Sequence, residues 1–280
     1  MRRVTVSAVR FAVIVAVGVA LSLALAPKAM AQMQSQQQGP VDVSGVDSLQ
    51  TELHMLTDVQ RQSVDNSQQK AYKEFYKVPA SDPDRRIELG TNFLRKYPKS
   101  PLDEGIEVGL TNAYYAKQDW NNFYASADQA LALNPDEVDV LTNVGWVIPH
   151  EYDPNGSNSP QLLDKAEQYE KHALDVLGKL PKPKGLSDAQ FAASKLQKQQ
   201  EAHSALGLVY FRRGDYANSM SELQQSTAGP NPDQTDLYVL ALDLQNLHRG
   251  ADAVAAFMRC SQISGALQAR CQQGAELASK

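Results

Sequence analysis

The sequence has few of the residues with which many enzymes do chemistry. It contains two cysteines and five histidines among 280 residues. No two histidines lie three or four positions apart, as metal ligands on one helix would. It has no HExxH sequence, no glycine-rich phosphate loop and no serine in a nucleophile-elbow context. We therefore expect a protein that is not an enzyme, with no catalytic residue, no cofactor and no metal.

Basic residues are outnumbered by acidic ones, 27 to 32. Arg2, Arg3 and Arg10 precede an apolar run at 11–26, and a small-x-small sequence follows at 29–31. This is the layout of a secretory signal peptide, residues 1–31, that is cut after Ala31. Its removal takes four of the 27 basic residues and no acid, which leaves 23 against 32 acidic residues and a net charge of −9. Such a surface argues against nucleic acid or an anionic membrane as partner.

The apolar run has 16 residues before Pro27, whereas a membrane-spanning helix needs about 20. The sequence therefore favours a cleaved signal and an exported protein, periplasmic or secreted from a bacterium, without membrane insertion. The alternative is an uncleaved segment that tethers the chain to the membrane as an accessory factor for envelope protein assembly.

Two regions follow the signal. Residues 32–69 are rich in Gln and Ser and contain the breakers Gly39, Pro40 and Gly45, which indicates a flexible leader. A short amphipathic stretch, Leu49 to Val59, favours a helix within it. From Lys70 to the end, helical windows alternate with short polar breaks and no strand-like alternation occurs. Residues 70–280 are predicted to be one all-α domain of antiparallel helix pairs.

The helical windows repeat with a period of 34 residues. Leu206 matches Leu240, and Leu110 matches Val144. The second helices keep the same spacing, since the residues at 219, 223 and 226 match those at 253, 257 and 260. Each helix pair is predicted to bury its apolar face only by stacking on its neighbours.

These residues carry a resemblance to a known family. The sequences LGLVY at 206–210, GDY at 214–216 and NPDE at 134–137 resemble tetratricopeptide repeats (TPRs), and FLRKYPKSP at 93–101 is similar to exported bacterial cell-envelope members of that family. The resemblance implies a right-handed solenoid of about five helix pairs with a C-terminal capping helix at about 266–279. One unit, 137–181, carries an insertion at 151–160.

In the resembled family, the first helices of the pairs line a concave groove that binds a peptide or a partner helix. The residue types of the family's carboxylate clamp are missing, since Val108, Thr142, Ser204 and Tyr238 occupy its positions. Packing between adjacent repeats is the alternative role for each groove position. The matching groove positions in this sequence are Asn112, Tyr115, Trp146, His150, Leu208, Phe211, Arg212, Tyr238, Leu242 and Gln245.

Three local features admit specific expectations. Gly207 lies in an apolar helix face, where glycine costs about 1 kcal/mol relative to alanine, so we expect close approach of a partner helix, with Gly214 ending the helix.

The insertion spaces Asp153 and Asp164 like a calcium loop, but its glycine is displaced from the required position and prolines interrupt it, so a turn is favoured. Export favours a disulfide between Cys260 and Cys271 across a reversal at Ser264-Gly265, with two ordinary buried cysteines as the alternative.

The sequence therefore predicts a protein-interaction scaffold or adaptor of the bacterial periplasm or cell envelope, with a protein partner. A helical enzyme with a small-molecule pocket is the less favoured alternative. The identity of the partner and the oligomeric state do not follow from the sequence.

Overall fold

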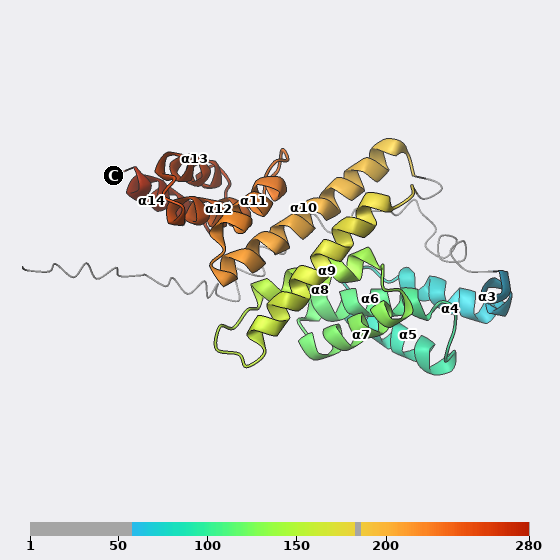
Figure 1. The fold of residues 1–280 in the computed structure, drawn as a ribbon. Coiled ribbons are helices and arrows are strands. Elements are labelled where there is room, and N and C mark those ends of the chain that lie inside the picture. The colour runs from blue at the N-terminus through green and yellow to red at the C-terminus, as the bar shows by residue number, and fades with distance from the viewer. Residues whose placement is uncertain (1–57, 183–185, 280) are drawn as a thin grey trace, which may run out of the picture. The chain divides into compact units, whose positions relative to one another are not determined.

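The computed structural model describes residues 58–182 and 186–279, and these form helices joined by turns, with no strand among them (Figure 1). The signal segment and most of the leader, including Leu49 to Thr57, lie outside the described residues. The helices are α3 (Asp58–Ser63), α4 (Asn66–Tyr76), α5 (Pro83–Lys96), α6 (Asp103–Lys117), α7 (Trp120–Leu133), α8 (Val138–His150), α9 (Ser159–Lys179), α10 (Asp188–Arg213), α11 (Tyr216–Ser226), α12 (Gln234–Asn246), α13 (Gly250–Ser261) and α14 (Gln268–Ala278).

Ten of these helices form five antiparallel pairs, α4/α5, α6/α7, α8/α9, α10/α11 and α12/α13, and α14 packs on α13 at the C-terminal end. Each pair contacts the next, and the first helices α6, α8, α10 and α12 also contact one another in succession. This confirms the all-α solenoid of about five helix pairs with a C-terminal capping helix. The helical region begins before Lys70, because Asp65 caps α4 by accepting hydrogen bonds from the backbone N–H groups of Ser67 and Gln68.

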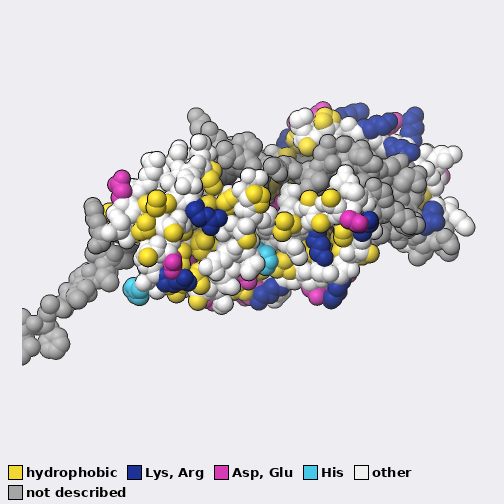
Figure 2. All heavy atoms as spheres, turned by 90° about the horizontal axis from the view of Figure 1, so that it is seen from above, with side chains coloured by type: hydrophobic (Ala, Val, Ile, Leu, Met, Phe, Trp, Pro, Cys, Tyr) yellow, Lys and Arg dark blue, Asp and Glu magenta, His cyan; other side chains and the backbone are white. Residues whose placement is uncertain are grey.

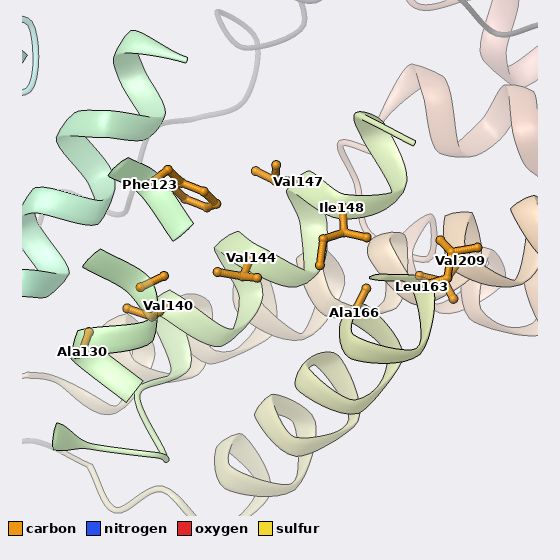
Figure 3. Close-up of a cluster of buried hydrophobic side chains, with 10 residues drawn as sticks. Phe123, Ala130, Val140, Val144, Val147, Ile148, Leu163, Ala166 and Val209 are labelled. Carbon is orange, nitrogen blue, oxygen red and sulfur yellow. The ribbon is translucent and has the colours of Figure 1, made fainter. Parts of the chain in front are cut away.

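The 34-residue period marks the buried positions. Leu110, Val144, Leu206 and Leu240 are all buried. Figure 3 shows the central cluster, in which Val144 and Ile148 of α8 lie between side chains of α7, α9 and α10, and Val209 brings the next pair into the same core. Burial of such side chains stabilises the fold by about 1.5–3 kcal/mol each, so the stacking of neighbouring pairs supplies the core that one pair lacks.

Two helices are longer than the repeat requires. α9 has 21 residues and α10 has 26, and they lie side by side as a long antiparallel hairpin (Figure 1). A capping box starts α10, in which the hydroxyl of Ser187 accepts from the N–H of Gln190 and the Gln190 side chain accepts from the N–H of Ser187. The repeat pattern therefore applies to the second half of α10 only.

Gly214 ends α10 in a left-handed conformation, as the sequence predicts. Gly214 has φ +76°, and its N–H donates to the carbonyl of Phe211. The carboxylate of Asp215 then accepts from the N–H of Asn218 at the start of α11. The sequence RRGD is thus the turn of a repeat.

Gly207 lies where α11 packs closely against α10. A Cβ atom at this position would lie 2.5 Å from Cγ of Leu223, which is buried on α11. The missing side chain therefore lets Leu223 pack against the α10 backbone, and this contact explains a glycine inside a helix.

The equivalent contact in the preceding pair has a different partner. Gly145 occupies on α8 the repeat position of Gly207, and a Cβ atom there would lie 2.6 Å from Cδ of Glu170 on α9. Glu170 is fully buried, and neither of its carboxyl oxygens has a hydrogen-bond partner in the part of the chain that the structure describes. Burial, followed by the charge of Glu201, raises the pKa of Glu170 well above its usual value.

The two cysteines join the last two helices. A disulfide links Cys260 of α13 to Cys271 of α14, both fully buried, with their Cα atoms 5.8 Å apart. The chain reverses between Ser261 and Gln268, which includes the predicted Ser264-Gly265.

Replacement of Gly207 tests the close approach. Gly207→Ala is expected to lower the free energy of unfolding by about 1–3 kcal/mol through overpacking against Leu223, despite the better helix propensity of alanine. In a Leu223→Ala background the same change is expected to be neutral or stabilising. Gly178→Ala is the control, because nothing lies within 4 Å of a Cβ atom there, and it is expected to be neutral or to stabilise by up to about 1 kcal/mol. Urea unfolding measures the wild type and the four variants, Gly207→Ala, Leu223→Ala, the double variant and Gly178→Ala, and a loss of stability at position 207 that persists without Leu223 would contradict the contact.

Replacement of Glu170 tests the buried carboxyl. Because the pKa of Glu170 is raised in the folded protein, the native state holds this proton more tightly than the unfolded chain, and stability falls as the pH rises above about 4.5. Glu170→Gln has no proton to lose at this position. With rising pH, its free energy of unfolding is therefore expected to fall less steeply than that of the wild type, and the two slopes differ by up to about 1.4 kcal/mol per pH unit. Urea unfolding between pH 5 and 8 measures the slope, with the exposed Glu88→Gln as control. Equal slopes for wild type and Glu170→Gln would show that Glu170 is not protonated on folding.

Candidate partner-binding face

The first helices of successive pairs are bridged by side chains. Asn143 of α8 donates to Oδ1 of Asn112 on α6 at 2.8 Å, and the rings of Tyr115 and Trp146 lie 6.2 Å apart across the same two helices. Between α10 and α12, the hydroxyl of Ser204 donates to Asp236 at 2.8 Å. Side chains therefore join α6 to α8 and α10 to α12, and the Ser204–Asp236 contact between the latter two is buried.

Aromatic rings gather at α6, α7 and α8. Tyr115 lies 6.1 Å from Trp120 and 6.0 Å from Phe123, both of α7. Trp146 stacks on His150, with ring centroids 3.6 Å apart and planes at 22°. Tyr115, Trp146 and His150 remain partly accessible, so this cluster offers rigid aromatic surface of the kind that anchors protein partners.

His150 is held neutral. Its Nδ1 lies 2.6 Å from the carbonyl oxygen of Trp146, and since a carbonyl can only accept, Nδ1 carries the hydrogen and Nε2 is an acceptor. Burial lowers the pKa of His150 to about 4, and the positive charge of Arg212 lowers it further. The ring therefore carries no charge near neutral pH.

Arg212 joins this cluster from α10. Its Nε donates to the carbonyl oxygen of Pro149 at 3.1 Å, and its guanidinium carbon lies 5.7 Å from the ring centroid of Tyr152. Pro149 is in the last turn of α8, where carbonyl groups lack helical partners. Arg212 thus connects the end of α8 to α10 on the same side as Trp146.

The other predicted groove residues are distributed unevenly. Leu208 and Tyr238 are buried, with 4% and 7% of their surfaces exposed, and the Tyr238 ring packs 5.8 Å from Phe257 of α13. These two residues belong to the packing between helices, contrary to the groove assignment, because α12 is buried along nearly its whole first three turns. Phe211 is partly exposed and lies 6.0 Å from Tyr216 of α11. Leu242 is partly exposed and Gln245 is exposed.

Two residues of this region were not predicted from the sequence. Asn143 lies three positions before Trp146, which places it one turn away on the same helix face, so it could have been found from that spacing. Tyr152 lies in the insertion, outside the repeat pattern, and no spacing rule points to it. We call the accessible set the first-helix face: Asn112, Tyr115, Asn143, Trp146, His150, Tyr152, Phe211, Arg212, Leu242 and Gln245.

The insertion is a compact turn. Oδ1 of Asp153 accepts from the N–H of Asn155 at 2.9 Å, and the carbonyl of Asp153 accepts from Gly156 and from the Ser159 hydroxyl. Asp164 pairs with Arg213 at 2.6 Å. Within the described ranges no group of three or more His, Cys, Asp or Glu side chains is placed to hold a metal ion.

Figure 2 shows one face of the molecule, on which hydrophobic side chains gather in several patches and basic and acidic side chains lie among and beside them. In the part of the chain that the structure describes, no helix combines the length and the apolar character that crossing a membrane requires.

No protein-family model matches the chain, and no curated protein is significantly similar to it. Twelve chains of solved structures are similar, and two of them are TPR proteins. TTC0263, a thermophilic TPR protein of Thermus thermophilus, has 16% identity and a TM-score of 0.48, with 74% of this chain and 98% of that chain covered. A tetratricopeptide repeat protein of Parabacteroides merdae has 13% identity and a TM-score of 0.32, with 77% and 100% covered. These values are too low to support conclusions about this chain, whose fold rests on its own helices.

Proposed function

We propose that this protein is a non-enzymatic scaffold or adaptor that binds a protein partner along its first-helix face. The observation that carries the proposal is the aromatic cluster of Tyr115, Trp146 and His150, which is fixed by neighbouring helices yet partly accessible. Preformed aromatic surface binds a partner at low entropic cost. The adjacent Asn112 and Asn143 supply amide groups that can pair with the backbone of an extended peptide or the polar side of a helix.

The proposed site of action is the bacterial periplasm or cell envelope. The N-terminal 31 residues have the layout of a cleaved signal, and the disulfide between Cys260 and Cys271 suits an oxidising compartment. An adaptor there would present its partner to an envelope assembly.

Site-specific crosslinking tests the binding face. A photoreactive p-benzoylphenylalanine at Asn112 is expected to form a discrete adduct with one protein in cells that produce the chain, because the side chain lies between α6 and α8 beside the aromatic cluster. The same probe at Leu133, exposed on the second helix α7, is the control and is expected to form no such adduct. Immunoblotting and mass spectrometry of the adducts give the readout. Equal adducts at both positions, or none at position 112, would argue against this face.

The intact mass of the exported protein tests the compartment. The mature chain is expected to begin at Gln32 and to lack the two hydrogens that a Cys260–Cys271 disulfide removes. Residues 32–280 produced in a reducing cytoplasm are the control and are expected to carry two free thiols. An exported chain that retains residues 1–31 would favour the membrane tether, and alkylated thiols at both positions would contradict the disulfide.

A further inference from the structure

Two adjacent arginines at the end of α10 have opposite environments. The fork of Arg213 is filled, because Nη2 pairs with Asp164 at 2.6 Å and Nη1 pairs with Glu167. Arg212 points to the other side, where its Nε donates to the carbonyl of Pro149. Its Nη1 and Nη2 donate to no group in the described residues, and no carboxylate there interacts with it.

This environment is unfavourable for an isolated cation. Arg212 is half-buried, and the loss of hydration lowers its pKa from the usual value, while the interaction with Tyr152 opposes this. A guanidinium nevertheless stays charged in proteins, and Nη1 and Nη2 of Arg212 are not among the buried unpartnered atoms of the described residues, so the fork is accessible to a bound group. Two Nη groups in a planar fork match the two oxygens of a carboxylate.

The residues around Arg212 favour a carboxylate over a phosphorylated group. In the described residues, the cation that contacts Pro149 and Tyr152 is the single guanidinium of Arg212, whereas phosphorylated groups carry close to two negative charges and are bound by clusters of arginines. The neutral His150, stacked on Trp146, and the ring of Tyr152 provide an apolar aromatic surface beside the fork. This arrangement suits a carboxylate with an apolar neighbour.

We propose that Arg212 anchors a subsite for an acidic side chain, Asp or Glu, in an extended segment of the protein partner. The adjacent apolar residue of that segment lies on Trp146 and Tyr152. A side chain fits better than a free C-terminus, because accessible residues continue on both sides, through Asn112 on α6 and through Leu242 on α12. This subsite rests on the proposed function, since it is part of the first-helix face.

The contact with Pro149 also allows a purely structural role for Arg212, as a cap of α8. That role uses Nε and leaves the Nη fork unused, so the two roles predict different results. A capping arginine affects stability but imposes no preference on the sequence of a bound peptide.

Peptide selection distinguishes them. The probe is a displayed library of random twelve-residue peptides held within a carrier protein, so that both peptide ends are blocked, and a second library presents free C-termini. Both are selected against residues 32–280 as wild type, Arg212→Gln, Arg212→Lys and Arg213→Gln. The last variant removes the same charge from the neighbouring residue that faces α9. Thermal unfolding establishes that each variant is folded.

The wild type and Arg213→Gln are expected to enrich peptides with an acidic residue next to an apolar one. Arg212→Gln is expected to lose the acidic preference and to bind a wild-type-selected peptide at least about tenfold more weakly, as for a lost charge-assisted hydrogen bond. Arg212→Lys is expected to bind with intermediate affinity, because it keeps the charge but not the fork.

Three results would overturn the subsite: peptides enriched without an acidic preference, an acidic preference that survives in Arg212→Gln, or acidic selection only at free C-termini. A different result, no enrichment by the wild type from either library, would count against the proposed peptide-binding face itself.

Discussion

The fold depends on how closely two helices of one pair can approach. At Gly207 the backbone of α10 has no side chain between it and Leu223, and any Cβ atom there would overlap with that leucine. The same position carries Gly145 in the preceding pair and Ala241 in the following one, and all three are buried. Small residues at this position set the distance within these three pairs, and the distance within the pair sets where the next pair can stack.

The side chain that packs against this glycine differs between pairs, and in one pair it is a buried carboxyl. Leu223 fills the contact at Gly207, but Glu170 fills it at Gly145 and buries its carboxyl. Polar groups are also buried between later pairs. Oγ of Ser219 lies 2.8 Å from the carbonyl oxygen of Gly207 and 2.5 Å from Oδ2 of Asp243. A hydroxyl has one hydrogen for these two oxygens, and burial raises the pKa of Asp243 to about 7, so a protonated Asp243 that donates to Ser219 satisfies both contacts.

The repeat spacing predicts which apolar side chains are buried, but not the buried carboxyls or the extended lengths of α9 and α10. Leu110, Val144, Leu206 and Leu240 share the 34-residue period and are all buried, because each pair must bury the same face. The buried carboxyls could not be predicted in this way, since acidic residues are normally exposed. The extension of α9 and α10 was missed for a related reason. Residues 188–200 carry no repeat signal, and the helix there depends on its cap and on packing against α9.

The first-helix face was predicted only in part, because a repeat position specifies a side of a helix and not its neighbours. Leu208 and Tyr238 lie on the predicted side, but adjoining helices cover them. Tyr115, Trp146, His150 and Arg212 lie together because contacts between α6, α8 and α10 bring them to one place. The spacing of 34 residues could not show that Tyr152, from the insertion, completes this group.

Arg212 and Arg213 are neighbours in α10 but contact different helices. Consecutive residues of a helix point about 100° apart, so Arg213 reaches α9 while Arg212 reaches α8. On the α9 side, Arg213 and Tyr210 both bind Glu167, and although burial opposes it, hydrogen bonds from Arg213, Lys171 and Tyr210 lower the pKa of Glu167 to about 2. These charge-assisted contacts fix α10 against the preceding pair. Arg212 is held on the α8 side by its own contacts, the hydrogen bond to the carbonyl oxygen of Pro149 and the ring of Tyr152, so little entropy is lost in ordering it when a group binds there.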